Sequence, residues 1–175
     1  MNAMKHMHIL LADAKEYKMT QTQFQLFKFQ KPEFERPSQS AILVDMDGTL
    51  ALREGHSTRD PYDWSRAGED GICPIVADIV DRFSPDHTII IFTARPESSK
   101  LICTNWLKKH NVPFDHIFTR KDKDNREDSI VKWEMFEEYV KPFWTVEFIL
   151  DDRQRVVDMW RTKGFKVLQV ASGDF

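Results

Sequence analysis

The feature that most constrains this chain is a pair of aspartates placed directly after a short apolar run. Residues 41–44 (Ala-Ile-Leu-Val) are typical of a buried strand, and residues 45–50 (Asp-Met-Asp-Gly-Thr-Leu) follow at once. Residues i and i+2 of an extended backbone share a face, so we expect the carboxylates of Asp45 and Asp47 to point the same way. Their repulsion calls for a cation, and Mg²⁺ prefers carboxylate and carbonyl oxygens. The alternative interpretation is a strand that ends in an ordinary acidic Asp-Gly turn.

Length and composition indicate one globular domain and argue against several classes of protein. The 175 residues are 41% hydrophobic and 30% charged, which is typical of a chain that buries a sizeable core. The formal net charge of −3 argues against a generally basic nucleic-acid coat, although it leaves room for a local basic groove. Cys73 and Cys103 form no C-x-x-C pair, so we expect neither a disulfide framework nor a zinc ribbon, and a reducing cytoplasm fits better. No apolar run approaches the roughly 20 residues of a membrane helix, so we expect no membrane partner.

The first 38 residues differ in character from the rest of the chain. They contain four methionines, so the natural start is open, and residues 9–12 are too short an apolar run for a secretory signal. Residues 21–30 carry three phenylalanines, which favours docking on the body of the protein or on a partner. Pro32 and Pro37 break regular structure before the first core strand. We therefore predict an N-terminal extension over residues 1–38, of unspecified structure, and one domain over residues 39–175.

Strand and helix patterns alternate along the second of these segments. Apolar or β-branched runs predict strands at residues 41–44, 88–92, 114–119, 146–150 and 166–170. Helical spacing of apolar residues predicts helices at residues 74–83, 96–110 and 129–139, and around residues 156–160. This alternation implies an α/β fold with a central parallel sheet covered by helices on both faces. Residues 53–64 are polar, turn-rich and too short for a cap domain, so we expect a small flap there.

Polar side chains recur where the predicted strands end. The set comprises Asp45 and Asp47, Thr93 and Arg95, Asp151 and Asp152, with Lys132 on a helix that approaches the same edge. Ligands of open parallel sheets bind at the carboxyl ends of the strands, so these distant clusters should meet in space. Each has an ordinary alternative: Thr93 as a helix cap, Lys132 as a solvated helix residue, and the Asp151-Asp152 pair as an acidic turn. Their joint occurrence in this order favours a functional site.

The same residues, in the same order, resemble the four motifs of the haloacid dehalogenase-like (HAD) phosphohydrolases, whose nucleophile motif reads D-x-D-G-T-L. The resemblance extends over about residues 41–171 and implies a HAD-like Rossmannoid three-layer sandwich without a large cap domain. Within this superfamily the chain is similar to the 3′-phosphatase domains of the T-even bacteriophage polynucleotide kinase-phosphatase family. The stretches that carry this similarity are residues 45–51, 59–63, 128–132, 151–153, 157–161 and 169–175.

The resemblance implies a role for each residue of the predicted site. Asp45 would attack phosphorus and form an aspartyl-phosphate, and Asp47 would protonate the leaving oxygen and then activate water. Thr93 and Lys132 would hold phosphate oxygens. A Mg²⁺ cofactor would be bound by Asp45, by Asp47 through its backbone carbonyl, and by Asp152 with or without Asp151. Spacing alone does not separate the nucleophile from the acid.

Arginines are candidates for holding the substrate, because a guanidinium suits phosphate oxygens. We expect this role for Arg59, Arg95 and Arg126, although the spacing between Leu50 and Arg59 departs from the family's pattern. Residues 120–127 mix cations with Asp122 and Asp124, which is equally typical of a track for a nucleic-acid backbone and of a solvated loop.

The function expected from this resemblance is a Mg²⁺-dependent polynucleotide 3′-phosphatase that acts on DNA or RNA 3′ ends in nucleic-acid repair, with 2′,3′-cyclic phosphate as a further candidate substrate. The sequence contains no phosphate-cradling G-x-x-x-x-G-K-[ST] motif, so we expect no kinase activity. The alternatives are a small-molecule HAD phosphatase such as a 5′-nucleotidase, and a binding protein that has lost catalysis, against which the complete motif set argues. We expect a cytoplasmic location, in the host cell if a phage encodes the chain. DNA or RNA preference and oligomeric state, including a homo-oligomer, stay open.

Overall fold

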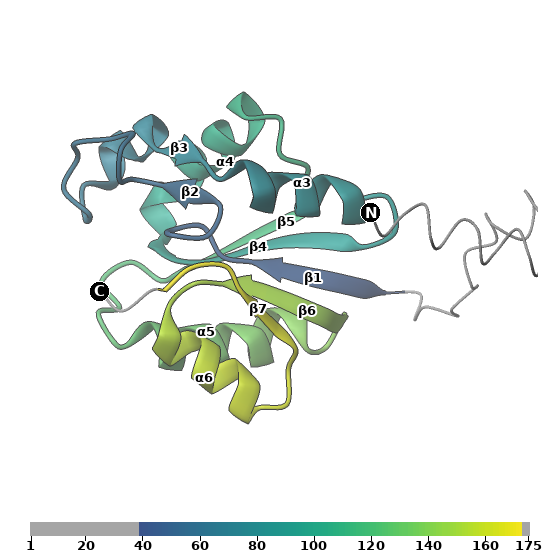
Figure 1. The fold of residues 1–175 in the computed structure, drawn as a ribbon. Coiled ribbons are helices and arrows are strands. Elements are labelled where there is room, and N and C mark those ends of the chain that lie inside the picture. Colours follow the sequence, from purple (N-terminus) through teal and green to yellow (C-terminus); the bar gives the residue numbers. More distant parts are fainter. Residues whose placement is uncertain (1–38, 173–175) are drawn as a thin grey trace, which may run out of the picture. The chain divides into compact units, whose positions relative to one another are not determined.

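The computed structural model describes residues 39–172, whose central element is a five-stranded sheet of order β5-β4-β1-β6-β7 (Figure 1). All of its strand pairs are parallel. The strands are β1 (Ser40–Val44), β4 (Thr88–Pro96), β5 (His116–Arg120), β6 (Thr145–Asp151) and β7 (Val167–Gln169). The expectations for residues 1–38, including the N-terminal extension, lie outside the described residues.

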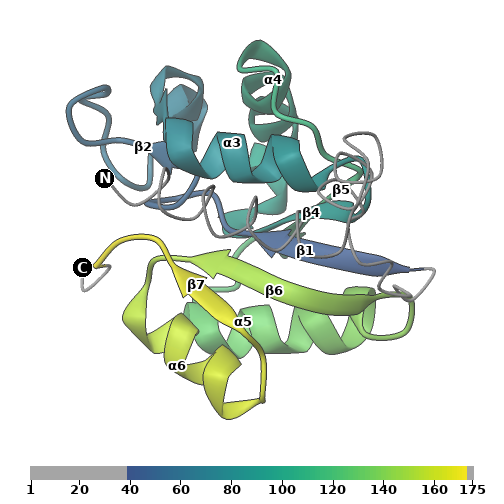
Figure 2. The ribbon, with the colours of Figure 1, turned by 45° about the vertical axis from the view of Figure 1, so that its right-hand side comes forward.

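Helices cover both faces of this sheet, as predicted (Figure 2). One face carries α3 (Pro74–Phe83) and α4 (Lys100–Lys109), and the other carries α5 (Asp128–Met135) and α6 (Gln154–Thr162). Side chains alternate along the strands, so each central strand contributes to two cores. In β1, Ile42 and Val44 pack toward α3 and α4, whereas Ala41 and Leu43 pack toward α5 and α6. Burial on both faces explains why these strands read as continuous apolar runs.

A small substructure stands over the carboxyl end of the sheet in place of a cap domain. It consists of the two-stranded antiparallel sheet of β2 (Ala51–Leu52) and β3 (Gly71–Ile72) and the short 3₁₀ helix η1 (Trp64–Glu69). The stretch predicted as a small flap, residues 53–64, lies in the segment between β2 and β3. No large cap domain occurs within residues 39–172, in agreement with the expected fold class.

Several element boundaries differ from those expected. The predicted strand 88–92 continues to Pro96, because the end of β4 pairs again with β5, Pro96 opposite Arg120. The predicted helix 96–110 starts as the 3₁₀ turn η2 (Glu97–Ser99) before α4. The predicted helix 129–139 is α5 followed by a π-helical segment, η3 (Phe136–Val140). Within the described part of the chain, none of the helices has the length and apolar character needed to cross a membrane.

Candidate functional site

Lys132 lies between two aspartates at the carboxyl ends of neighbouring strands. Its side chain comes from α5 and is buried, and Nζ donates to Oδ1 of Asp45 and to Oδ2 of Asp151, both at 2.7 Å. Asp45 follows β1 and Asp151 ends β6, and these strands pair with Val44 opposite Leu150. One ammonium therefore joins a helix and two strands at the edge where parallel sheets bind ligands.

Burial and neighbouring charges shift the ionisation of this group of residues. Burial raises the pKa of Asp45 well above its usual range, and the carboxylates of Asp151, Asp152 and Asp47 raise it further, whereas Lys132 opposes the shift. Burial lowers the pKa of Lys132, but Asp151 and Asp45 outweigh this and raise it overall, so Lys132 stays charged. Burial and then Asp151 raise the pKa of Asp152. These carboxylates therefore carry more negative charge than the ammonium of Lys132 neutralises.

The donor set of this cluster fits a divalent cation of the Mg²⁺ type. Carboxylate oxygens of Asp45, Asp151 and Asp152 lie within 4.8 Å of one another, and such hard oxygen ligands are those Mg²⁺ prefers. Three carboxylates face the single ammonium of Lys132, which leaves a formal charge of −2 when all are ionised. A divalent cation would balance that charge. The participation of the Asp47 carbonyl stays a prediction.

Asp152 is held in place by the turn that follows β1. Its Oδ1 accepts a hydrogen bond from the Thr49 hydroxyl at 3.0 Å, in a buried position. Gly48 has φ of 79°, and a Cβ added there would lie 2.2 Å from Oδ2 of Asp152. Glycine at this position therefore serves two needs, a left-handed backbone and room for the carboxylate.

Asp47 has different partners from Asp45, although the two were expected to share a face and a cation. Strand β1 ends at Val44, and the chain turns before Asp47. Arg95 donates to both oxygens of Asp47, from Nε at 2.8 Å and from Nη2 at 2.7 Å. The Asp47 side chain is 37% exposed, so it is held from behind by Arg95 and open to solvent in front. The two aspartates of the motif therefore differ in their exposure and in their charged partners.

Arg59 and Arg95 share a second carboxylate, Asp70, which the sequence did not indicate. Arg59 pairs with Asp70 through Nε at 2.8 Å and Nη2 at 2.7 Å, and Nη2 of Arg95 donates to Asp70 at 3.0 Å. The Trp64 ring lies 5.4 Å from both guanidinium carbons. The carboxylates of Asp47 and Asp70 balance the guanidiniums of Arg59 and Arg95, so this group of four side chains has no formal net charge. Asp70 precedes Gly71 and reads in the sequence as a turn residue.

Thr93 lies inside β4 rather than at the start of a helix, which excludes the helix-cap interpretation. The residue is fully buried, and its Oγ1 accepts a hydrogen bond from the backbone N–H of Arg95 at 3.2 Å. Because Ile91 of β4 pairs with Val44 of β1, Thr93 is carried to the end of β1, beside the aspartate motif.

The cationic residues between positions 120 and 126 have different partners and different exposure. Arg126 is about half exposed and pairs with Asp124 and Glu134, so its predicted role with substrate stays a prediction. Arg120 belongs to β5 rather than to the predicted loop, and its side chain turns toward Asp128 at the start of α5. Asp128 also accepts from Arg153, which follows Asp152. The loop interpretation fits Lys121 and Lys123, which are exposed.

The chain is similar to several known proteins. The family described as the polynucleotide kinase PNKP phosphatase domain matches residues 39–175. A putative bifunctional polynucleotide kinase/RNA ligase of Autographa californica nuclear polyhedrosis virus is 28% identical over 126 residues, 69% of this chain and 18% of that protein. A chain in the structure of a Pnkp1/Rnl/Hen1 complex is 35% identical with a TM-score of 0.75, over 80% of this chain and 49% of that one. The class C acid phosphatase from Bacillus anthracis shares the fold, at 17% identity and a TM-score of 0.60 over 81% of this chain and 70% of that one.

This chain therefore spans less than a fifth of the viral relative's length and about half of the chain in the complex.

Gly48→Ala should destabilise the protein more than Gly55→Ala does. Both glycines have positive φ, 79° and 74°, but a Cβ at Gly55 meets nothing within 4 Å. Gly55→Ala therefore measures backbone strain alone, about 1 kcal/mol. Gly48→Ala adds the displacement of Asp152 and should cost about 2–3 kcal/mol in total. Urea unfolding of the two variants checks this, and equal losses would show that Asp152 does not depend on the space at Gly48.

Proposed function

Since the chain belongs to the family of PNKP phosphatase domains, we propose that it removes the 3′-terminal phosphate from DNA or RNA ends, with Mg²⁺ as cofactor and Asp45 as nucleophile. The observation that supports the proposal most directly is that the two aspartates of the motif have different surroundings. Asp45 is buried beside an ammonium and two further carboxylates, whereas the Asp47 side chain is 37% exposed and held by a guanidinium.

Asp45 is suited to attack phosphorus because its neighbourhood offsets the repulsion between a carboxylate and a phosphate ester. Lys132 fixes Oδ1 of Asp45, so Oδ2 is the oxygen left to react. A bound Mg²⁺, held by Asp45, Asp152 and Asp151, would supply positive charge for the phosphate oxygens. Attack transfers the phosphoryl group to Asp45 as an acyl phosphate, and the bond from phosphorus to the 3′ oxygen breaks.

Asp47 is suited to move the proton in both steps. In the first step it donates a proton to the leaving 3′ oxygen, and in the second it takes one from the water that hydrolyses the acyl phosphate. Arg95 fixes the plane of the carboxylate by contacting both oxygens, while its 37% exposure lets it reach the substrate. Thr93, which β4 carries to the end of β1, would contact phosphate oxygens beside Asp45.

The flap supports a polymer substrate because it is too small to enclose the site as a cap domain would. The segment between Leu52 and Gly71 holds only the short helix η1 and turns. A nucleic-acid end has to enter without its remaining nucleotides being enclosed. The proposal assigns no kinase step to these 175 residues, which contain no G-x-x-x-x-G-K-[ST] motif.

A substrate panel tests the proposed function. We expect kcat/KM to be highest for 3′-phosphorylated oligonucleotides and lower for 3′-mononucleotides, 5′-mononucleotides and p-nitrophenyl phosphate. If the polymer backbone contributes contacts, the oligonucleotide rate should fall as salt rises, because phosphate contacts release counterions. Preference for free 5′-mononucleotides with no turnover of oligonucleotide 3′ ends would favour a nucleotidase instead. A 2′,3′-cyclic phosphate end belongs in the same panel.

Asp47→Asn should slow hydrolysis of a 3′-phosphorylated oligonucleotide far more than hydrolysis of p-nitrophenyl phosphate. The sugar oxygen is a poor leaving group and needs a proton, an effect worth about 10²–10⁴-fold, whereas nitrophenolate leaves unaided. Release of the alcohol in a single turnover is the quantity to measure, because the second step also uses Asp47. Equal losses for the two substrates would show that Asp47 is not mainly an acid.

Asp152→Asn should leave the metal-free protein as stable as wild type or more stable, and should remove most of the stabilisation by Mg²⁺. The amide retains an oxygen for the Thr49 hydroxyl and removes one of three crowded charges. Affinity for Mg²⁺ should fall about tenfold or more, which thermal unfolding against Mg²⁺ concentration reports. Asp124→Asn, outside the cluster, is the control and should respond to Mg²⁺ like wild type. An unchanged response in Asp152→Asn would argue against this metal site.

A further inference from the structure

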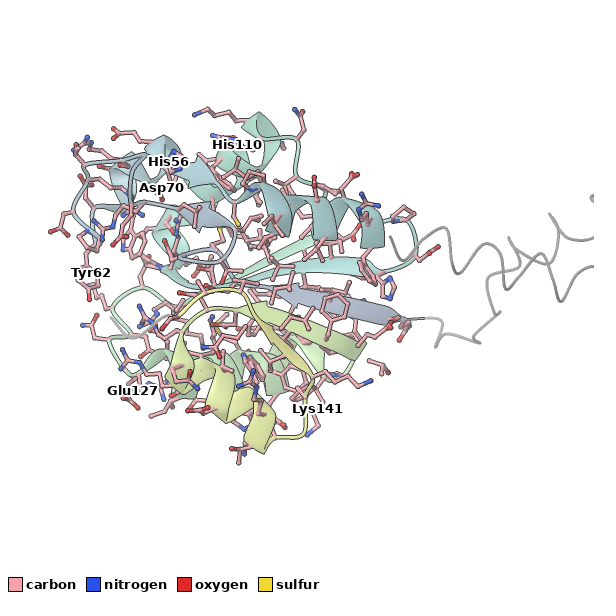
Figure 3. All side chains as sticks on the ribbon, viewed as in Figure 1. His56, Tyr62, Asp70, His110, Glu127 and Lys141 are labelled. Carbon is pink, nitrogen blue, oxygen red and sulfur yellow. The ribbon has the colours of Figure 1, made fainter. Side chains whose placement is uncertain are left out.

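Tyr62 is an aromatic residue presented to solvent beside the site. It is 81% exposed, the highest value among the large hydrophobic residues exposed in residues 39–172. Figure 3 places it at the edge toward which the strands point in Figure 1, on the flap side of that edge. A single exposed aromatic is ordinary on a protein surface. Tyr62 differs in its position beside the site and in the contacts that fix its turn.

The backbone around Tyr62 is fixed by the site. The N–H of Tyr62 donates to Oδ1 of Asp60 at 2.8 Å, which closes a tight turn over Pro61. Nη1 of Arg59 donates to the carbonyl oxygens of Asp60 at 3.0 Å and Pro61 at 2.8 Å. The same guanidinium lies 3.6 Å from Oδ1 of Asp47 through Nη2. The ring is thus mounted on a preordered turn that is tied to the acid of the proposed reaction.

The ring of Tyr62 also contacts the aromatic residue that supports the two arginines. Its centroid lies 6.5 Å from that of Trp64, with an interplanar angle of 86°. Trp64 in turn lies against Arg59 and Arg95, which hold Asp47. Tyr62 therefore stands on the Asp47 side of the site, whereas Lys132 and the carboxylate cluster hold the other aspartate, Asp45.

The chemistry of the reaction decides what comes to that side. Asp47 must contact the leaving oxygen, and in a 3′-phosphorylated strand this oxygen belongs to the sugar of the last nucleotide. The last nucleoside therefore lies toward Asp47, and toward the turn that carries Tyr62. Every base has a π-face, so an exposed aromatic ring binds the terminal base without reading its identity.

We propose that Tyr62 is a stacking platform for the nucleobase of the 3′-terminal nucleotide, a role that rests on the proposed function and adds a substrate-binding residue to it. The platform explains how a site with a small flap selects a nucleic-acid end over a simple phosphate ester. It acts on binding of the nucleoside and takes no part in the chemical step.

The test combines a change in the protein with a change in the substrate. The substrates are one oligodeoxynucleotide with a 3′-phosphate, ending either in an adenine nucleotide or in an abasic tetrahydrofuran nucleotide. Wild type should favour the base-bearing strand by about tenfold in kcat/KM, within the range for one stacked base, with the difference in KM. Tyr62→Ala should bring this ratio close to one, Tyr62→Leu should lose most of it, and Tyr62→Phe should retain it.

Phe143→Ala is the matched control. Phe143 is an exposed aromatic with its own edge-on tryptophan neighbour, Trp144 at 5.5 Å, but it precedes β6 and so lies at the amino end of the strands. The ratio of kcat/KM for the base-bearing strand to kcat/KM for the abasic strand should be the same in Phe143→Ala as in wild type. A second readout uses a strand whose terminal base is 2-aminopurine, a fluorophore that stacking quenches. Binding of this strand to the inactive Asp45→Asn protein should quench the fluorescence. The double variant Asp45→Asn/Tyr62→Ala should quench it less.

Two results would overturn the inference. An unchanged ratio in Tyr62→Ala, whether both strands are hydrolysed as by wild type or both are slowed equally, would show that Tyr62 does not contact the base while the proposed function stands. If wild type hydrolyses neither oligonucleotide but does hydrolyse 5′-mononucleotides, the proposed function fails and the stacking role fails with it.

Discussion

The arrangement of this site depends on one buried ammonium. Lys132 is 3% exposed and bridges Asp45 and Asp151, so α5 and the ends of β1 and β6 are fixed relative to one another by two hydrogen-bonded ion pairs. Removing a charge of this kind from water costs several kcal/mol, which is offset only when partners of good geometry surround it. The apolar strands bring the two carboxylates together, and Lys132 offsets the repulsion between them.

The distribution of charge then separates the site into two halves that differ in their charge balance. Around Asp47 and Asp70, two guanidiniums balance two carboxylates, so that half is electrically complete. Around Asp45, three carboxylates share one ammonium, so that half is short of positive charge. A phosphate ester needs cations near its oxygens and a carboxyl group near its leaving oxygen. The half around Asp45, which is short of positive charge, would bind such a cation. The half around Asp47 orients the carboxyl group that would lie near the leaving oxygen.

The sequence predicted the strands and the order of the sheet-edge residues because both depend on local patterns. β-branched runs mark β1 and β4, and the polar residues stand directly after the apolar ones. It did not predict the partners of the charges, which depend on tertiary contacts: Asp70 and Trp64 lie in a polar stretch that reads as turn, yet both support the arginines. The pairing of Arg126, a candidate for holding the substrate, with Asp124 and Glu134 is also a tertiary feature that the sequence did not indicate. The extension of β4 to Pro96 likewise depends on its pairing with β5.

Phosphorylation of Asp45 during turnover is the measurement that distinguishes attack by Asp45 from direct attack by water. A 3′-phosphorylated oligonucleotide is mixed with enzyme and Mg²⁺, the reaction is quenched in acid within milliseconds, and the digested protein is analysed by mass spectrometry. Attack by Asp45 predicts an acid-stable, hydroxylamine-sensitive phosphoryl group on the peptide that contains Asp45, and none on the Asp45→Asn protein. A phosphoryl group on another residue, or alcohol release by Asp45→Asn at the wild-type rate, would contradict it.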